Sequence, residues 1–167
     1  MPAVSTQRQP ASVSAPELRT RLERFDLWSL PDGERDGVEA AQGFLHSAHA
    51  AIESLQIILA RECPSEARPD LNELLDMAEG AQGKVSSFLI SFTEVLHHRQ
   101  ERLMFSMADK RRLSRLTGYT SDYARTIREA SSRIPASMPE ARLLWHSIGD
   151  NLEFVKRELK DIWPASA

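Results

Sequence analysis

The chain has 167 residues, of which 41% are hydrophobic and 27% are charged, and its formal net charge is −3. This length suits a single domain with a real core, and the composition is too apolar for a wholly disordered chain. A net charge this close to zero excludes a general attraction to nucleic acid or to anionic membranes, so any such binding must be local.

The cysteine content and the hydrophobic runs bear on the cellular compartment. The single cysteine, Cys63, cannot close an internal disulfide, which excludes a secreted cysteine-rich scaffold and fits a reducing compartment. No apolar run approaches the ~18 residues of a membrane span, and the opening residues lack the apolar stretch of a secretory signal. The sequence therefore predicts a cytoplasmic protein without a transmembrane segment.

The first fifteen residues are predicted to be a flexible tail, because they are small and polar with a single arginine. Residues 16–167 are predicted to form one helical domain. Its first element is a short helix from about Pro16 to Trp28, since Ser14 and Glu17 have the spacing of a capping box. The Leu-Pro-Asp-Gly sequence at 30–33 is typical of a turn and ends this helix.

Two long helices are predicted next from their hydrophobic spacing. One runs from about Glu34 to Glu62, where apolar residues recur in alternating steps of three and four, as in a bundle. The other begins near Pro69, with acidic residues in its first turns, where the positive end of a helix dipole favours them. Neither glycine nor proline occurs between residues 84 and 117, so helix-breaking residues do not define where this second helix ends.

Two interpretations of that stretch are open, and we prefer a break near Ser106. Ser106 and Asp109 have the spacing of a capping box, so a new helix can begin there and end before Pro135. The alternative is one unbroken helix that continues to Gly118. A last helix is predicted to follow a third capping box, Ser137 with Glu140, and to end at Trp163.

These elements predict an all-α fold, an antiparallel up-down four-helix bundle of long helices with a short N-terminal helix, because short connections place consecutive helices side by side. The predicted core includes Leu45, Ile52, Phe88, Phe92, Tyr123, Ile148 and Leu152. Tryptophans 28, 145 and 163 and Phe154 are also interpreted as core residues, since they fall at or near the apolar positions.

No catalytic or metal site is predicted. Glu94 and His97 have the E-x-x-H spacing of a di-iron ligand pair, but the chain contains only one such element. His46 and His49 could contribute to a zinc site or accept a phosphoryl group, but no acid lies nearer to them in the sequence than Glu53, and Cys63 has no second cysteine for a thiolate site. No nucleophile motif and no phosphate-binding loop occurs, so no cofactor is expected.

The uneven distribution of charge is the strongest functional signal. Residues 70–98 hold one basic and five acidic side chains, whereas residues 99–134 hold nine basic and four acidic ones. An antiparallel hairpin with its turn near Ser106 would gather basic side chains at one end of the bundle. We call this predicted partner-binding set the basic pole; it consists of Arg99, Arg102, Lys110, Arg111, Arg115 and Arg125.

The sequence therefore predicts a non-enzymatic regulatory or adaptor bundle that binds an acidic surface of a protein partner through the basic pole. The partner's identity is not specified, and self-association into a homo-oligomer is also open. Two alternatives are a histidine phosphotransfer bundle and a secreted bacterial effector whose basic pole binds lipid or nucleic acid. Specific nucleic-acid recognition is not expected.

Overall fold

The computed structural model describes residues 12–63, 65–102 and 104–164, apart from the side chains of residues 100–102. Within these ranges the chain forms five α-helices, two short 3-10 helices and no strand, which confirms the all-α prediction. The elements are α1 (Ala15–Leu22), η2 (Leu27–Ser29), α2 (Asp32–Glu62), α3 (Arg68–Arg102), α4 (Met107–Glu129), η3 (Ala130–Arg133) and α5 (Pro139–Ile162).

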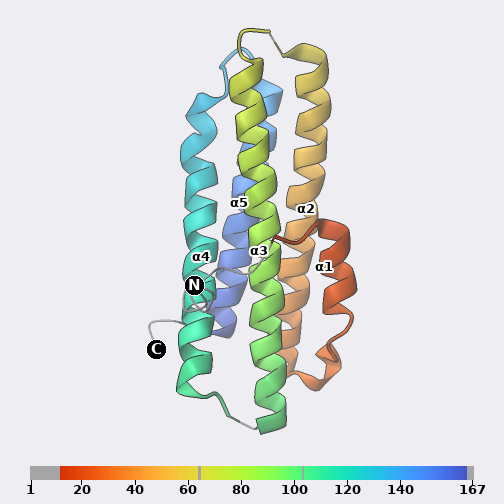
Figure 1. Ribbon diagram of the computed structural model, residues 1–167, viewed down its shortest axis with the longest axis vertical. Coiled ribbons are helices and arrows are strands. Elements are labelled where there is room, and N and C mark those ends of the chain that lie inside the picture. Colours follow the sequence, from red (N-terminus) through yellow and green to blue (C-terminus); the bar gives the residue numbers. More distant parts are fainter. Residues whose placement is uncertain (1–11, 64, 103, 165–167) are drawn as a thin grey trace, which may run out of the picture.

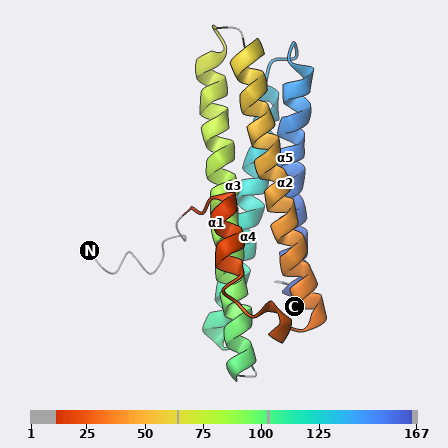
Figure 2. The ribbon, with the colours of Figure 1, turned by 90° about the vertical axis from the view of Figure 1, so that its right-hand side faces the viewer.

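The long helices lie lengthwise against one another. Helix α2 packs against α3 and α5, and α4 packs against the same two helices. Figure 1 shows that α2, α3, α4 and α5 each run in the direction opposite to the preceding one. Helix α1 packs against α3 and α2, and Figure 2 shows it lying outside them in the half of the molecule where α2 begins.

A continuous hydrophobic core fills the space between these helices. Six of the seven predicted core residues are buried, namely Leu45, Ile52, Phe88, Phe92, Ile148 and Leu152. Tyr123 is the exception, because it is only partly buried at the boundary between α4 and α3, where its ring centroid lies 5.8 Å from that of Phe88.

The aromatic residues predicted for the core have different environments. Trp145 is fully buried, and its indole Nε1 donates to the carbonyl of Ile127 at 2.6 Å, which satisfies the polar atom of the ring. The prediction for Trp28 is wrong, because this side chain is 78% exposed and carries the Arg35 guanidinium 4.4 Å from its ring centroid. Trp163 is partly buried, and Phe154 lies at the surface beside Phe44.

The helix break near Ser106 is confirmed. Helix α3 ends at Arg102, and Ser106 is the N-cap of α4. Ser106 Oγ accepts a hydrogen bond from the Asp109 amide at 3.0 Å, and the Asp109 carboxylate accepts one from the Ser106 amide at 3.0 Å. This reciprocal capping box satisfies two amides that the first turn would leave unpaired, so the unbroken helix to Gly118 is wrong.

Two other predicted helix boundaries need correction. Ser14 caps α1 by accepting from the Glu17 amide at 3.3 Å, but α1 ends at Leu22 and the chain turns before the separate 3-10 segment η2. The predicted capping box at Ser137 is wrong, because α5 begins at Pro139 with Met138 as its N-cap. Proline is favoured at a first helical position, since its ring fixes φ and it has no amide to leave unpaired.

The segment before α1 is docked on α3. The Val13 amide donates to the carbonyl of Gly83 at 3.0 Å, and the Val13 side chain is only 2% exposed. The structure thus places Val13 against the bundle, and the flexibility predicted for this segment stays a prediction. Residues 1–11, which make up the rest of the predicted tail, lie outside the described residues.

Candidate interaction surface

The first turns of α4 present three exposed basic side chains from the predicted basic pole: Lys110, Arg111 and Arg115. We call these three residues the α4 basic cluster. The apolar side of α4, which includes Leu113, Leu116 and Thr120, is buried against α3 and α5. Because an α-helix turns by about 100° per residue, Arg111 and Arg115 point away from that buried side.

Arg99, which was predicted to belong to the basic pole, contacts the start of α2 instead of lying beside these three side chains. Its Nη1 donates to Glu34 Oε2 at 2.8 Å, and its Nη2 donates to Glu34 Oε1. The side chains are 16% and 17% exposed, and the Phe105 ring lies 4.8 Å from the guanidinium. This bidentate ion pair uses both terminal nitrogens of the guanidinium. Arg99 therefore joins α3 to the start of α2 and is not available to a partner.

The remaining two residues of the predicted basic pole differ from the α4 basic cluster. Arg125 is exposed, but it pairs with Asp122 at 3.0 Å and lies more than two turns further along α4 than Arg115. The side chain of Arg102 lies outside the described residues. The structure thus exposes Lys110, Arg111 and Arg115 near the start of α4, and it places Arg99 in a contact between α3 and α2.

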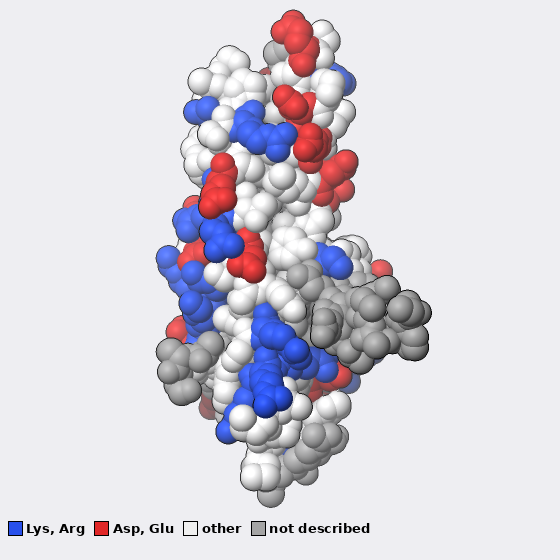
Figure 3. Space-filling view, turned by 60° about the vertical axis from the view of Figure 1, so that its left-hand side comes forward, with Lys and Arg blue, Asp and Glu red and all other residues white. Residues whose placement is uncertain are grey.

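The charge of the α4 basic cluster is not explained by the stability of α4. Lys110 and Arg111 follow the first turn of α4, where positive charge gains no stabilisation from the helix dipole. None of the three cations forms an ion pair with a described residue. Figure 3 shows basic side chains gathered in the lower part of the visible face, and a row of acidic ones toward the opposite end.

Exposed methionines lie beside the α4 basic cluster. Met104 is 67% exposed in the connection before α4, and Met107 is 63% exposed in its first turn. Met107 and Arg111 are four residues apart, so they lie on the same side of the helix. A partner that covers this end of α4 would therefore contact apolar as well as positively charged side chains.

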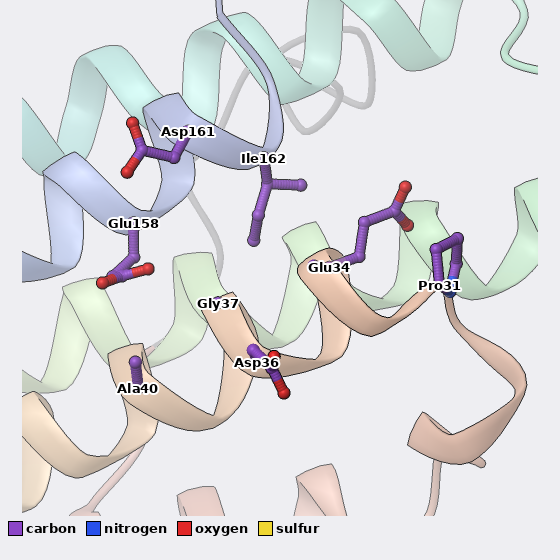
Figure 4. Close-up of a pocket in the computed structure, with 9 residues that line it drawn as sticks. Pro31, Glu34, Asp36, Gly37, Ala40, Glu158, Asp161 and Ile162 are labelled. Carbon is purple, nitrogen blue, oxygen red and sulfur yellow. The ribbon is translucent and has the colours of Figure 1, made fainter.

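An acidic depression lies at the same end of the molecule, between the start of α2 and the end of α5, and sequence analysis did not predict it. It has a volume of about 630 Å³ and is shown in Figure 4. Its lining includes Glu34, Asp36, Glu158 and Asp161. Burial, and then the nearby charge of Asp161, raise the pKa of the Glu158 carboxyl. The end of the molecule at which α4 begins therefore carries acidic as well as basic side chains.

The histidines considered as chemical sites are spread among structural contacts. His46 is half-buried, and desolvation, followed by the charges of Arg19 and His49, lowers its pKa. His49 lies 3.2 Å from Glu53, and the His97 ring packs 5.8 Å from Phe25. Among the described residues, no group of three or more His, Cys, Asp or Glu side chains has an arrangement that could hold a metal ion.

No described helix combines the length and the apolar character needed to cross a membrane. Comparison of the chain with protein-family models, with curated proteins and with solved structures found no match.

Proposed function

We propose that the protein is a non-enzymatic interaction module, built as an antiparallel up-down four-helix bundle of α2 to α5 with α1 laid against it. The α4 basic cluster binds an acidic surface of a protein partner, and the module acts as a regulator or adaptor. The packing of α2 and α4 against both α3 and α5, with alternating helix directions, supports the bundle topology.

The observation that carries the functional proposal is the placement of Lys110, Arg111 and Arg115. These cations are exposed, lie together at the start of one helix, and have no ion-pair partner among the described residues. Their mutual repulsion is only partly screened over the ~8 Å that applies at physiological salt. An acidic partner surface relieves that repulsion and makes association depend on ionic strength.

The test is capture of partners from the source cell by the full chain and by the double variant Arg111→Glu/Arg115→Glu. We expect the wild type to enrich a reproducible protein at low salt, and the double variant to lose at least about tenfold of that enrichment. The matched control is Arg21→Glu/Arg24→Glu, which makes the same charge change at exposed positions on and just after α1. Equal enrichment by wild type and Arg111→Glu/Arg115→Glu would contradict the proposal.

The two other functions have distinct readouts. A phosphotransfer function through His46 or His49 requires incorporation of phosphate from a phosphodonor, which the interaction module does not show. A lipid- or nucleic-acid-binding function requires the wild type to bind anionic vesicles or generic DNA, with a steep loss at high salt. We also propose a cytoplasmic location, because the single Cys63 suits a reducing compartment.

A further inference from the structure

Two of the six large hydrophobic side chains that are exposed among the described residues lie at the start of α4. They belong to Met104, which is 67% exposed, and Met107, which is 63% exposed. Their Cα atoms are at most about 11 Å apart, because only two residues separate them. Exposed apolar side chains scattered singly are ordinary, but neighbouring ones rimmed by polar groups mark interaction sites.

Met107 lies directly beside the cations of the α4 basic cluster. At 100° per residue, Met107, Arg111 and Arg115 fall within an arc of about 80° on the exposed side of α4, and Lys110 borders this arc. From Met107 to Arg115 the surface covers about 12 Å along the helix axis, which is a little over two turns. We call the surface made by Met104, Met107 and the α4 basic cluster the α4 docking surface.

The helix that carries these cations does not balance their charge. Asp109 is the only acidic residue in the sequence from 104 to 121, and its carboxylate is part of the cap of α4. The cations further along α4 have carboxylate partners, since Arg125 pairs with Asp122 at 3.0 Å and Arg128 pairs with a carboxylate of α5 at 3.2 Å. Unpaired positive charge among the described residues of α4 therefore lies at its start.

We infer that the α4 docking surface binds an amphipathic helix of the partner protein. This helix carries two carboxylates on successive turns and a large apolar side chain on the turn beside them. The carboxylates pair with Arg111 and Arg115, and the apolar side chain packs on Met104 and Met107. The inference rests on the proposed function, because it gives the chemistry of the acidic surface that the α4 basic cluster binds.

The spacing along α4 favours a helix as the bound segment. Arg111 and Arg115 are about 6 Å apart along the axis, which is close to the rise of one helical turn. A helix that lies along α4 therefore places successive turns opposite Met107, Arg111 and Arg115. Carboxylates four residues apart on such a helix reach both guanidinium groups, which bind carboxylates in bidentate geometry.

The methionines supply the part of the contact that does not depend on charge. Exposed ion pairs contribute little to affinity and are screened by salt, whereas large side chains buried at the centre of an interface contribute most of it. Methionine suits this role, because its unbranched thioether side chain adapts to apolar groups of different shape. We therefore expect binding to weaken with salt and to keep a residual affinity that Met104 and Met107 provide.

The acidic depression at the same end of the molecule favours a narrow ligand over an anionic membrane. Its lining includes Glu34, Asp36, Glu158 and Asp161. A flat anionic surface laid across this end would meet these carboxylates as well as the α4 basic cluster. A helix about 10–12 Å wide can instead lie along α4 alone.

The test is selection from a random library of displayed peptides of about 16 residues, roughly four helical turns, on the full wild-type chain and on two double variants. On the wild type we expect enriched peptides with two acids four residues apart and a large apolar residue three or four positions from them. Arg111→Glu/Arg115→Glu should no longer select the acids. Met104→Ser/Met107→Ser should still select the acids but lose the preference for the apolar residue.

A synthetic peptide from the wild-type selection measures each contribution by fluorescence anisotropy. At low salt, binding is expected to weaken at least about tenfold with Arg111→Glu/Arg115→Glu, because the acids then face like charges. Binding is expected to weaken at least about fivefold with Met104→Ser/Met107→Ser, because the apolar residue of the peptide loses its contact. At high salt, the methionine variant should lose the residual affinity that the wild type keeps.

The matched control is Ile57→Ser/Leu143→Ser, which removes two exposed apolar side chains from α2 and α5. It should leave the affinity for the peptide unchanged. An equal loss in this control and in Met104→Ser/Met107→Ser would contradict a specific role of the methionines. Circular dichroism melts of each variant show whether the fold is retained.

Three outcomes would overturn the inference. The first is enrichment of acidic peptides without an apolar preference, and the second is the absence of acidic peptides that depend on Arg111 and Arg115. The third is binding to vesicles of phosphatidylserine and phosphatidylcholine that is lost with Met104→Ser/Met107→Ser while no acidic peptide is selected, which would assign the surface to lipid.

The proposed function is judged separately by capture from the source cell. A captured partner that is lost with Arg111→Glu/Arg115→Glu and fully retained with Met104→Ser/Met107→Ser would overturn the inference and keep the proposed function. Loss with both double variants is the result that the inference expects.

Discussion

Arg99 of α3 and Glu34 of α2, which are 65 residues apart in the chain, form a bidentate ion pair that is largely shielded from water. The Phe105 ring lies over the guanidinium, and it packs edge-on against Trp163, with 5.1 Å between the ring centroids. The remaining guanidinium nitrogen, Nε, is buried without a hydrogen-bond acceptor among the described residues. This pair joins the end of α3 to the start of α2, directly beneath the connection that leads to α4.

Breaking this pair is expected to destabilise the fold from either side. Glu34→Ala leaves the shielded Arg99 guanidinium without its carboxylate, and Arg99→Ala leaves the shielded Glu34 carboxylate without its guanidinium. Each variant should therefore lose about 1–3 kcal/mol of unfolding free energy. Urea unfolding of the two single variants and of Glu34→Ala/Arg99→Ala measures this directly. The double variant is expected to lose less unfolding free energy than the two single variants lose together. In the double variant neither charge is left buried without its partner.

The exposed Asp122–Arg125 pair supplies the control for that experiment. Both side chains are about 60% exposed, so Arg125→Ala should change the unfolding free energy by less than about 0.5 kcal/mol. Strict additivity of Glu34→Ala and Arg99→Ala would show that the two side chains are not coupled, which contradicts the pairing.

Two helical glycines are expected to respond oppositely to alanine. Gly118 has open space where a Cβ would stand, so Gly118→Ala should stabilise the protein by about 0.5–1 kcal/mol through the higher helix propensity of alanine. A Cβ on Gly37 would lie 2.6 Å from Cδ1 of Ile162 and 2.9 Å from its Cγ1. Gly37→Ala should therefore destabilise the protein, because this contact outweighs the higher helix propensity of alanine. Thermal melts of both variants test the contrast.

The cause of the difference can be isolated with Ile162→Ala. In that background the obstructing side chain is gone, and Gly37→Ala should become stabilising, like Gly118→Ala in the wild type. If Gly37→Ala is equally harmful with and without the Ile162 side chain, contact with Ile162 is not what requires a glycine at this position.

Local signals in the sequence predicted the parts of the fold that local physics determines. The break at Ser106 was predictable because a capping box is formed within four residues, and its two hydrogen bonds are both present. Core residues such as Ile52 and Leu152 were predictable because helical spacing alone puts them on the apolar side. The same reasoning failed at Trp28, where the chain leaves helical geometry before the tryptophan is reached.

The residues of the candidate surface were only partly predictable, because helical spacing within one helix does not show how two helices are aligned. Exposure of Arg111 and Arg115 follows from the apolar spacing of a single helix. The loss of Arg99 from that surface depends on how α2 and α3 are aligned, and no local pattern encodes the contact with Glu34. One signal for this contact was available in the sequence. In a predicted antiparallel pair of helices, the carboxylate of Glu34 at the start of one helix lies at the same end as Arg99 near the end of the next.

The Glu158 carboxyl is expected to make stability depend on pH. Burial and the charge of Asp161 raise its folded-state pKa above the ordinary value of 4.5, so the ionised form is penalised in the folded protein. The penalty is complete above the raised pKa and disappears as the pH falls through it toward 4.5 and below. Glu158→Gln should therefore raise the melting temperature at pH 7, and the difference should vanish near pH 4.

The control for charge alone is Glu39→Gln, which makes the same change in net charge at an exposed position on α2. A rise in melting temperature that is equal for Glu158→Gln and Glu39→Gln would assign the effect to net charge. A Glu158→Gln difference that persists unchanged down to pH 4 would show that it does not come from ionisation.

The docking of the segment before α1 gives the last prediction. Val13 is 2% exposed, and its amide donates to the Gly83 carbonyl, while a Cβ on Gly83 would lie 3.2 Å from the Ser12 Cβ. Val13→Ala should therefore cost about 1–3 kcal/mol of unfolding free energy, which is the value of burying much of a valine side chain. Because its hydrogen bond is protected, the Val13 amide should exchange slowly with solvent in the native protein. Gly83→Val should speed that exchange by crowding Ser12, whereas Gly80→Val, with open space around it on the same helix, should not. Complete exchange of the Val13 amide at the earliest measured time would show that this segment leaves α3 freely in solution.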